Sequence, residues 1–299
     1  MKLDYQPKGV EFFYIYKPLA HPEYENYVKP FTIQERLMHV MEAKRRLGSS
    51  ITWLSDTMEN DYHKMVGETP NSELVIGPDG VVVARRAWSN PEALRDDLER
   101  LVGPVDNETQ PEDVDLPQQG MIGTVVKGIV PRVERPEGMM PMMVEPDLDS
   151  SRAPFYTKLR AEGTMDFYET GNGKMYLGFH LDPLYRVHWN NEAPAMSYDI
   201  TPDDGVTISP AQAIGPRPEE KADADPREFL VDVQSDEPGK GFNLTVRYYA
   251  CDDAVTFCIP VKQDYRVVMS RNTSHGWTMT TNPDGSTNRG TPPPMREIL

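Results

Sequence analysis

Residues 242–261, FNLTVRYYACDDAVTFCIPV, contain two strand patterns joined by a short polar connection. Apolar and polar side chains alternate from Phe242 to Tyr249, which is typical of a strand with one buried face. Cys251 follows this run, and Cys258 opens the next strand pattern. Two strands joined so closely can bring their ends to about 4.5–5.5 Å between Cα atoms, which is within disulfide range. The stretch therefore predicts a β-hairpin that a Cys251–Cys258 bond can close.

The spacing of the two cysteines leaves two interpretations of the bond open. A closed ring of about eight residues contributes roughly 2.5 kcal/mol through chain entropy, which a sandwich domain hardly needs. A structural staple in an exported domain and a redox pair therefore have equal weight on spacing alone. A total of 2 Cys in 299 residues excludes a disulfide scaffold and a four-cysteine zinc site.

Short strand patterns recur between turns in the part of the chain that contains the hairpin. Their spacing predicts an all-β, antiparallel sandwich domain over 156–270, immunoglobulin-like in the loose sense. The tail, 271–299, is rich in Pro, Gly, Asn and Thr, a composition typical of a flexible segment. The predicted strands lie at 174–181, 184–189, 195–200, 205–209, 228–233, 242–249 and 257–268.

The first third of the chain alternates strand and helix patterns. Thr32 and Glu35 form a capping box at one helix start, and Asn90 is the predicted N-cap of another. The order β-α-β-α-β-β-α predicts a thioredoxin-like α/β domain over 1–104. The predicted strands are 9–16, 51–54, 74–76 and 81–83, and the predicted helices are 32–48, 57–66 and 90–103.

Residues 105–155 form the predicted connection between the two domains. This segment begins acidic and then contains repeated Gly, Pro and Met, which favours a linker. Residues 121–130 could add a weak edge strand to either neighbour. Clustered thioethers are soft ligands that suit Cu(I), although a hydrophobic strip that docks the linker is the simpler interpretation. The methionines are Met139, Met140, Met142 and Met143.

The charge balance limits the partners of the chain. Lys and Arg number 31 against 47 Asp and Glu, so the net charge of −16 repels phosphate backbones and anionic membranes. We expect neither nucleic-acid binding nor membrane insertion, and residues 1–6 lack a secretory signal pattern. We expect no cofactor and no metal ion, since His180 and His188 are too scattered to be ligands and His275 lies in the tail.

The first domain resembles a family of redox proteins over about residues 5–103. The strand 10–16, the step Ala20-His21-Pro22, and the later Arg36 and Asp56 are similar to the iodothyronine-deiodinase-like redoxins. In that family the nucleophilic selenocysteine or cysteine precedes the strand that matches 9–16. The resemblance therefore implies a domain without its nucleophile, and it assigns His21 to the active-site region. Extending the reading frame upstream is expected to reveal a Cys or selenocysteine unit.

The second domain is similar to the N-terminal domain of the thiol:disulfide interchange protein DsbD over roughly 160–270. The resemblance implies an immunoglobulin-like sandwich whose cysteines cycle between dithiol and disulfide outside the cytoplasm. They would receive electrons from a membrane partner and pass them to thioredoxin-like proteins. This chain has one more residue between its cysteines than the family pattern. The matching stretches are 179–183, 188–191, 205–210, 248–254 and 257–260.

Together these patterns predict an extracytoplasmic or periplasmic thiol–disulfide exchange protein with site residues Cys251, Cys258 and His21. Its expected partner is a thioredoxin-fold redox protein or a membrane electron donor. Asp252 and Asp253 are expected to raise the thiol pKa, which favours slow exchange that requires a docked partner. The alternatives are a non-catalytic protein-binding module with a structural disulfide and a copper-binding protein that uses the methionine cluster.

Overall fold

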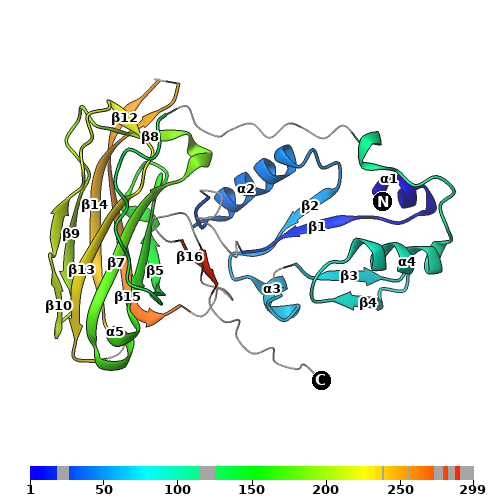
Figure 1. Ribbon diagram of the computed structural model, residues 1–299, viewed down its shortest axis with the longest axis horizontal. Helices are drawn as coiled ribbons and strands as arrows, with labels where there is room; N and C mark the ends of the chain where they lie inside the picture. The colour runs from blue at the N-terminus through cyan, green and yellow to red at the C-terminus, as the bar shows by residue number, and fades with distance from the viewer. Residues whose placement is uncertain are drawn as a thin grey trace. The chain divides into compact units, whose positions relative to one another are not determined.

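The computed structural model describes residues 1–18, 27–69, 71–114, 125–237, 239–254, 256–272, 279–281 and 287–289. It divides the chain into two compact units (Figure 1). Unit 1 comprises Met1–Ala20, Pro30–Met121 and Pro294–Leu299, and unit 2 comprises His21–Lys29 and Ile122–Pro293. The described fold is mostly β, with one large antiparallel sheet in unit 2 and few helices.

Unit 1 begins with two short helices that were not predicted, and its next elements follow in the predicted order of strands and helices. The capping box forms, because Thr32 Oγ1 accepts a hydrogen bond from Glu35 N at 3.2 Å. At the last helix, Asn90 Oδ1 accepts hydrogen bonds from the amides of Glu92 and Ala93. The elements are α1 (Lys2–Tyr5), η1 (Gln6–Lys8), β1 (Phe13–Tyr16), α2 (Ile33–Arg46), β2 (Thr52–Ser55), α3 (Asp61–Met65), β3 (Glu73–Ile76), β4 (Val82–Arg86), α4 (Pro91–Val102) and η2 (Pro111–Asp113).

The strands described for unit 1 form two separate pairs, so the single sheet expected of a thioredoxin-like domain is not shown. β1 pairs with β2 in parallel and β3 pairs with β4 antiparallel, and no ladder among the described residues joins the two pairs. Large apolar side chains therefore remain exposed on these strands, among them Phe13, Leu54 and Ile76. The local patterns form the expected elements, and the pairing among the described residues leaves them as two separate pairs of strands.

Unit 2 is built around an antiparallel sheet with the order β10-β13-β7-β6-β5-β15-β14-β8-β12. β9 also pairs with β14, and β11 pairs with β9. The elements are β5 (Met140–Asp147), η3 (Leu148–Ser150), β6 (Thr157–Gly163), α5 (Met165–Thr170), β7 (Asn172–Leu181), η4 (Pro183–Tyr185), β8 (Val187–Asn190), β9 (Ser197–Pro202), β10 (Val206–Ser209), β11 (Gln212–Ile214), β12 (Ala222–Asp223), β13 (Arg227–Ser235), β14 (Gly241–Asp252), β15 (Cys258–Arg271), β16 (Met279–Thr281) and β17 (Thr287–Arg289). The last two strands form a separate pair.

The sheet folds over so that its two halves pack against each other. Tyr198 of β9 lies against Phe179 of β7 and Phe229 of β13, with ring centroids 6.0 and 4.9 Å apart. At another point of the core, Phe155 contacts the edge of the Tyr265 ring of β15 at 5.6 Å. The result is a β-sandwich-like unit, whose strands Figure 1 shows. Aromatic side chains form part of the core between its halves.

β5 joins the two halves, and here the structure differs from the predicted linker over 105–155. Met140 and Pro141 pair with β6, whereas Met142–Asp147 pair with β15. The prolines at 141 and 146 and the run of methionines concealed this strand, since proline is unusual inside a sheet. In the segment 121–130, a single parallel bridge joins Val126 to Asp223, and residues 121–124 lie outside the described residues.

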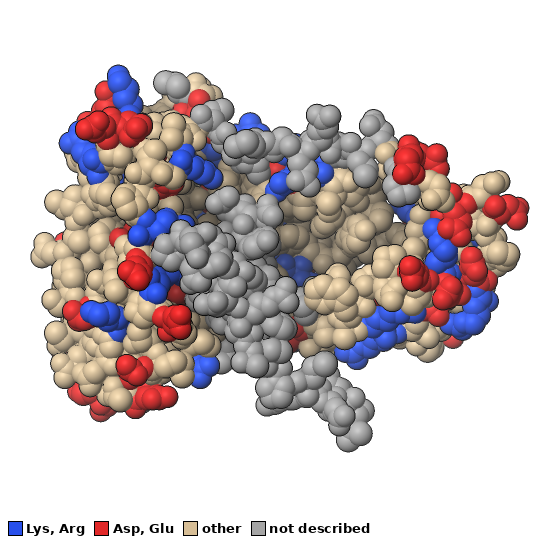
Figure 2. Space-filling model, in the orientation of Figure 1, with Lys and Arg blue, Asp and Glu red and all other residues tan. Residues whose placement is uncertain are grey.

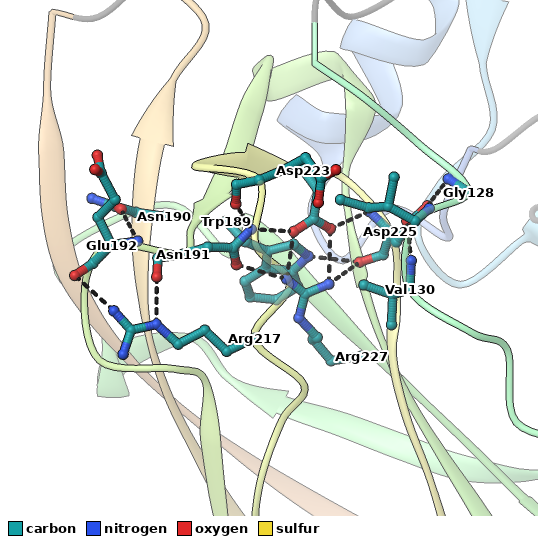
Figure 3. A network of polar contacts seen from close by, with 12 residues as sticks. Gly128, Val130, Trp189, Asn190, Asn191, Glu192, Arg217, Asp223, Asp225 and Arg227 are labelled. Atoms are coloured by element: carbon teal, nitrogen blue, oxygen red, sulfur yellow. Dashed lines mark hydrogen bonds and ion pairs between the residues drawn. The ribbon is translucent and has the colours of Figure 1, made fainter.

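A buried ion pair lies beneath β8. Arg227 and Asp223 are 1% and 0% exposed, and their two hydrogen bonds measure 2.8 and 2.7 Å. Asn191 Nδ2 donates a further bond of 2.8 Å to Asp223 (Figure 3). Burial alone would raise the pKa of Asp223, but the bonds from Arg227 and Asn191 hold it below its ordinary value.

Asp225 extends this network to the segment that precedes β5. Its carboxylate accepts hydrogen bonds from three successive amides at 2.7–2.9 Å, those of residues 128, 129 and 130. Its carbonyl accepts a bond of 2.7 Å from the indole of Trp189 in β8. The buried network therefore fixes β8 from the core side and attaches residues 128–130 to the same place (Figure 3).

The Asp223–Arg227 pair gives a stability prediction with a matched control. Arg227→Gln leaves a buried carboxylate without its cation, so we expect the free energy of unfolding to fall by about 3 kcal/mol or more. Arg247→Gln removes a pair with Asp199 whose two side chains are half exposed, and should cost less than about 1 kcal/mol. Urea unfolding measures both values, and equal losses for the two variants would contradict the assignment.

Asp203, after β9, gives a second prediction, which concerns pH. Hydrogen bonds from Arg266, at 2.8 and 2.6 Å, lower the pKa of Asp203 to about 2. A carboxylate with a lower pKa in the folded state stabilises the fold above its unfolded pKa and loses this effect as the pH falls. We expect the unfolding free energy of the wild type minus that of Asp203→Asn to be constant above about pH 5 and to shrink between about pH 4 and 2. Urea titrations across this range test the expectation, and a difference independent of pH would count against it.

Candidate functional site

The two cysteines lie opposite each other at the end of the β14–β15 hairpin and form a disulfide. Cys251 is near the end of β14, Cys258 is the first residue of β15, and their Cα atoms are 4.0 Å apart. The ladder behind them runs in continuous register from Gly241 and Val268 to Ala250 and Ile259. The hairpin predicted from the sequence is therefore present, with the cysteines at the end that adjoins the connecting loop.

Asp252 organises the loop between the cysteines. Its carboxylate accepts hydrogen bonds from the amide and hydroxyl of Thr256, both at 2.6 Å, and from the amide of Phe257 at 2.8 Å. The bond from Phe257 is the largest of the effects that lower the pKa of Asp252. The turn is thus held by side-chain bonds of its own, of the kind that aspartate makes in short turns.

The disulfide lies on the outer face of the sandwich-like unit. Along β14, Tyr248 and Ala250 face the core, so strand alternation turns Cys251 to the other side. Neighbouring side chains nevertheless leave Cys251 only 7% exposed, whereas Cys258 is an exposed residue. The two ends of the bond therefore differ in their access to another molecule.

Two side chains of β8 adjoin the disulfide. His188 lies directly opposite Cys251 in the β14–β8 ladder, and its Nδ1 is 3.1 Å from Asp253 Oδ1. The side chains of His188 and Asp253 are only 13% and 11% exposed. Asn190, two residues further along β8, donates a hydrogen bond from Nδ2 to Cys258 Sγ at 3.3 Å.

These contacts change the expected electrostatics of the cysteine pair. In the sequence-based prediction, the negative charges of Asp252 and Asp253 lie beside the thiols and are expected to raise the thiol pKa. In the structure the Asp252 carboxylate is bonded to the loop, and the Asp253 carboxylate faces His188. Each of the two carboxylates therefore has a bonding partner other than the cysteines. The site also contains the imidazole of His188, which the sequence-based prediction did not include among the site residues.

An aromatic group borders the loop. The Tyr156 ring is buried, stacks on Phe257 with centroids 6.1 Å apart and contacts the Tyr185 ring edge-on at 5.1 Å. Burial, followed by the charge of Asp252, raises the pKa of Tyr156. The group packs the loop against the start of β6, next to Cys258.

The resemblance to deiodinase-like redoxins singled out residues of unit 1, and two of them interact. Arg36 is buried and donates from Nη1 to the backbone oxygen of Asp56 at 3.3 Å and from Nη2 to Asn60 Oδ1 at 3.0 Å. The Asp56 carboxylate accepts bonds from the amides of Thr57, Tyr62 and His63, at 2.8–3.0 Å. These contacts connect α2, β2 and α3. His21 lies outside the described residues.

The described histidines and acidic groups do not gather into a metal site. Among the described residues, no group of three or more His, Cys, Asp and Glu side chains is arranged to hold a metal ion. His180 lies on β7, away from His188 on β8, and desolvation by the surrounding protein lowers its pKa to about 3. His275 lies outside the described residues.

The methionines that could have formed a soft-ligand cluster face different directions. Met139 and Met142 are buried in the core, whereas strand alternation turns Met143 outward, where Ser270 Oγ lies 3.4 Å from its sulfur. A Cu(I) site would need several thioethers to converge on one point. The geometry of β5 separates them and does not favour the copper alternative.

Two observations concern the partners of the chain, namely the charges on its described surface and the composition of its described helices. On the face drawn in Figure 2, acidic and basic side chains of the described residues are interspersed. None of the helices in the described part of the chain combines the length and apolar composition needed to cross a bilayer.

The different exposure of the two sulfurs gives a chemical prediction. After reduction, we expect iodoacetamide to alkylate the lone thiol of Cys251→Ser, which is Cys258, several times faster than that of Cys258→Ser, which is Cys251. Mass spectrometry of samples quenched over time measures both rates, and unfolding in urea should make them equal. Equal rates in the folded variants would contradict the described asymmetry.

Comparisons with protein-family models, with curated proteins and with solved structures found no match to this chain.

Proposed function

We propose that the chain is a thiol–disulfide exchange protein whose redox centre is the Cys251–Cys258 pair. The observation that carries the proposal is the position of the bond, on the outer face with Cys258 exposed and Cys251 covered. Exchange requires one sulfur that a partner thiolate can reach and a second sulfur held close enough to leave and return. The hairpin meets both requirements.

The reaction follows from this asymmetry. A partner thiolate attacks Cys258 Sγ, a mixed disulfide forms, and Cys251 leaves as a thiolate. The second thiol of the partner, as its thiolate, then attacks the partner's own sulfur in the mixed disulfide and releases Cys258. Two thiols of the partner are oxidised to a disulfide, and the protein disulfide is reduced to two thiols. The reverse sequence transfers electrons from the protein.

The hairpin can undergo this change without losing its structure. Its register is kept by the continuous β14–β15 ladder, and its turn is kept by the hydrogen bonds of Asp252. A structural staple is needed where other contacts are few, and here they are many. The surroundings of the bond therefore support a redox role over the alternative of a binding module with a structural disulfide.

The proposed partner and location rest on the resemblance of the hairpin to the DsbD N-terminal domain. We propose an extracytoplasmic protein that exchanges electrons with a thioredoxin-fold protein or a membrane electron donor. In this proposal unit 2 is an immunoglobulin-like sandwich. Unit 1 is a thioredoxin-like, deiodinase-like domain without its own nucleophile, and tethering it to unit 2 would raise the local concentration of any redox partner that binds it.

A redox titration with matched variants tests this function. We expect a reduction potential above roughly −300 mV and exchange with reduced thioredoxin, while circular dichroism shows that the reduced protein stays folded. When the partner is a thioredoxin whose single remaining cysteine is held as a mixed disulfide with thionitrobenzoate, the Cys258 thiol of Cys251→Ser should attack that disulfide, join the two proteins and release thionitrobenzoate, and Cys258→Ser should do so far less. A potential well below roughly −300 mV without exchange would identify a structural disulfide instead.

A further inference from the structure

His188 and Asp253 form a polar pair next to the covered sulfur. β8 and β14 are neighbouring antiparallel strands, and directly opposite residues of such strands project to the same face with Cβ atoms about 4.5–5.5 Å apart. His188 is the residue opposite Cys251, so its ring lies on the disulfide face of the sheet. Asp253 follows Cys251 by two residues and reaches back to His188 Nδ1 at 3.1 Å.

Backbone contacts hold the pair in place from both sides. The amide of Asp253 donates to the carbonyl of Arg186 at 2.9 Å, so the start of the loop is fastened to the start of β8. On the core side of β8, Trp189 is bonded to Asp225 within the buried network. The imidazole therefore has little freedom to move away from Cys251.

We propose that His188, oriented by Asp253, exchanges a proton with the Cys251 thiol during the disulfide exchange. This inference rests on the proposed function and adds a proton donor and acceptor to it. A carboxylate at Nδ1 favours the ring form that carries a proton there and leaves Nε2 as the nitrogen that gains and loses one.

The proton balance follows the electron balance. When a partner thiolate attacks Cys258, the electron pair of the broken bond stays on Cys251, which takes a proton from the imidazolium. The neutral imidazole regains a proton from water. In the opposite direction, the imidazole accepts the proton of the Cys251 thiol, and the resulting thiolate attacks the mixed disulfide at Cys258. Neither step needs another oxidant or reductant.

The charged groups around His188 permit this role. On the hairpin, Asp253 contacts the ring and Asp252 is bonded to the loop. On β12, the other strand paired with β8, Asp223 is buried in its pair with Arg227. Arg186 lies just before β8. Asp253 is thus the group among these that is bonded directly to the imidazole.

The rate of reduction by dithiothreitol, divided by the concentration of dithiothreitol thiolate, tests the proposal between about pH 5.5 and 8.5, where an imidazole changes charge. We expect this normalised rate to be about tenfold higher at the acid end in the wild type and to fall as the pH rises.

Three variants show which groups cause this rise in rate at the acid end. His188→Gln should remove the rise and give a rate that does not change with pH. Asp253→Asn, which keeps the ring but removes the carboxylate that orients it, should reduce the rise in rate at the acid end to well below the tenfold of the wild type. His63→Gln, in α3 of unit 1, is the control and should match the wild type.

The outcomes separate this inference from the proposed function. A wild type that exchanges with reduced thioredoxin, together with a pH profile unchanged in His188→Gln, overturns the role of His188 and leaves the redox pair standing. A wild type that fails to exchange overturns the proposed function itself. If His188→Gln does not fold, the profile of Asp253→Asn decides, and a rise at the acid end as large as that of the wild type overturns the proposal.

Discussion

The buried contact between Asp223 and Arg227 is the constraint on which the site depends. It lies on the core side of β8, and Asn191 and Trp189 connect that strand to the same group of charges. Because Trp189 faces inward, its neighbours His188 and Asn190 face outward, towards the two cysteines. The buried network of Asp223 and Arg227 thereby fixes β8, and with it the positions of His188 and Asn190 on the outer face of unit 2.

The local elements could be predicted from the sequence because each has its own short-range signal. The capping box at Thr32, the cap at Asn90 and the alternation before Cys251 appear in the structure where they were expected. β5 and β6 were missed. β5 carries Pro141 and Pro146, which are atypical of an interior strand, and its partners lie far away in the sequence. The packing of unit 1 into one sheet was expected from the order of its elements, but order does not determine pairing.

The candidate site could be predicted only in part for the same reason. The cysteine pair is close in the sequence, so its hairpin could be recognised. His188 becomes a neighbour of Cys251 only through the pairing of β8 with β14. A strand pattern indicates which face a side chain occupies, but it does not identify the residue opposite. Alternation along 187–190 could have shown that His188 and Asn190 share a face, and nothing local connected that face to the cysteines.

The position of β5 also determines when this unit can be completed during synthesis. β5 is the first strand of the sheet to leave the ribosome, yet Val144 must wait for Val267, in the last strand of the large sheet, before its ladder can form. Pairings between segments so distant along the chain close slowly, because the intervening loop must be ordered first. Until then Met142 of β5 and Met139 just before it have no finished core to enter, so this part of the nascent chain keeps apolar surface in contact with water.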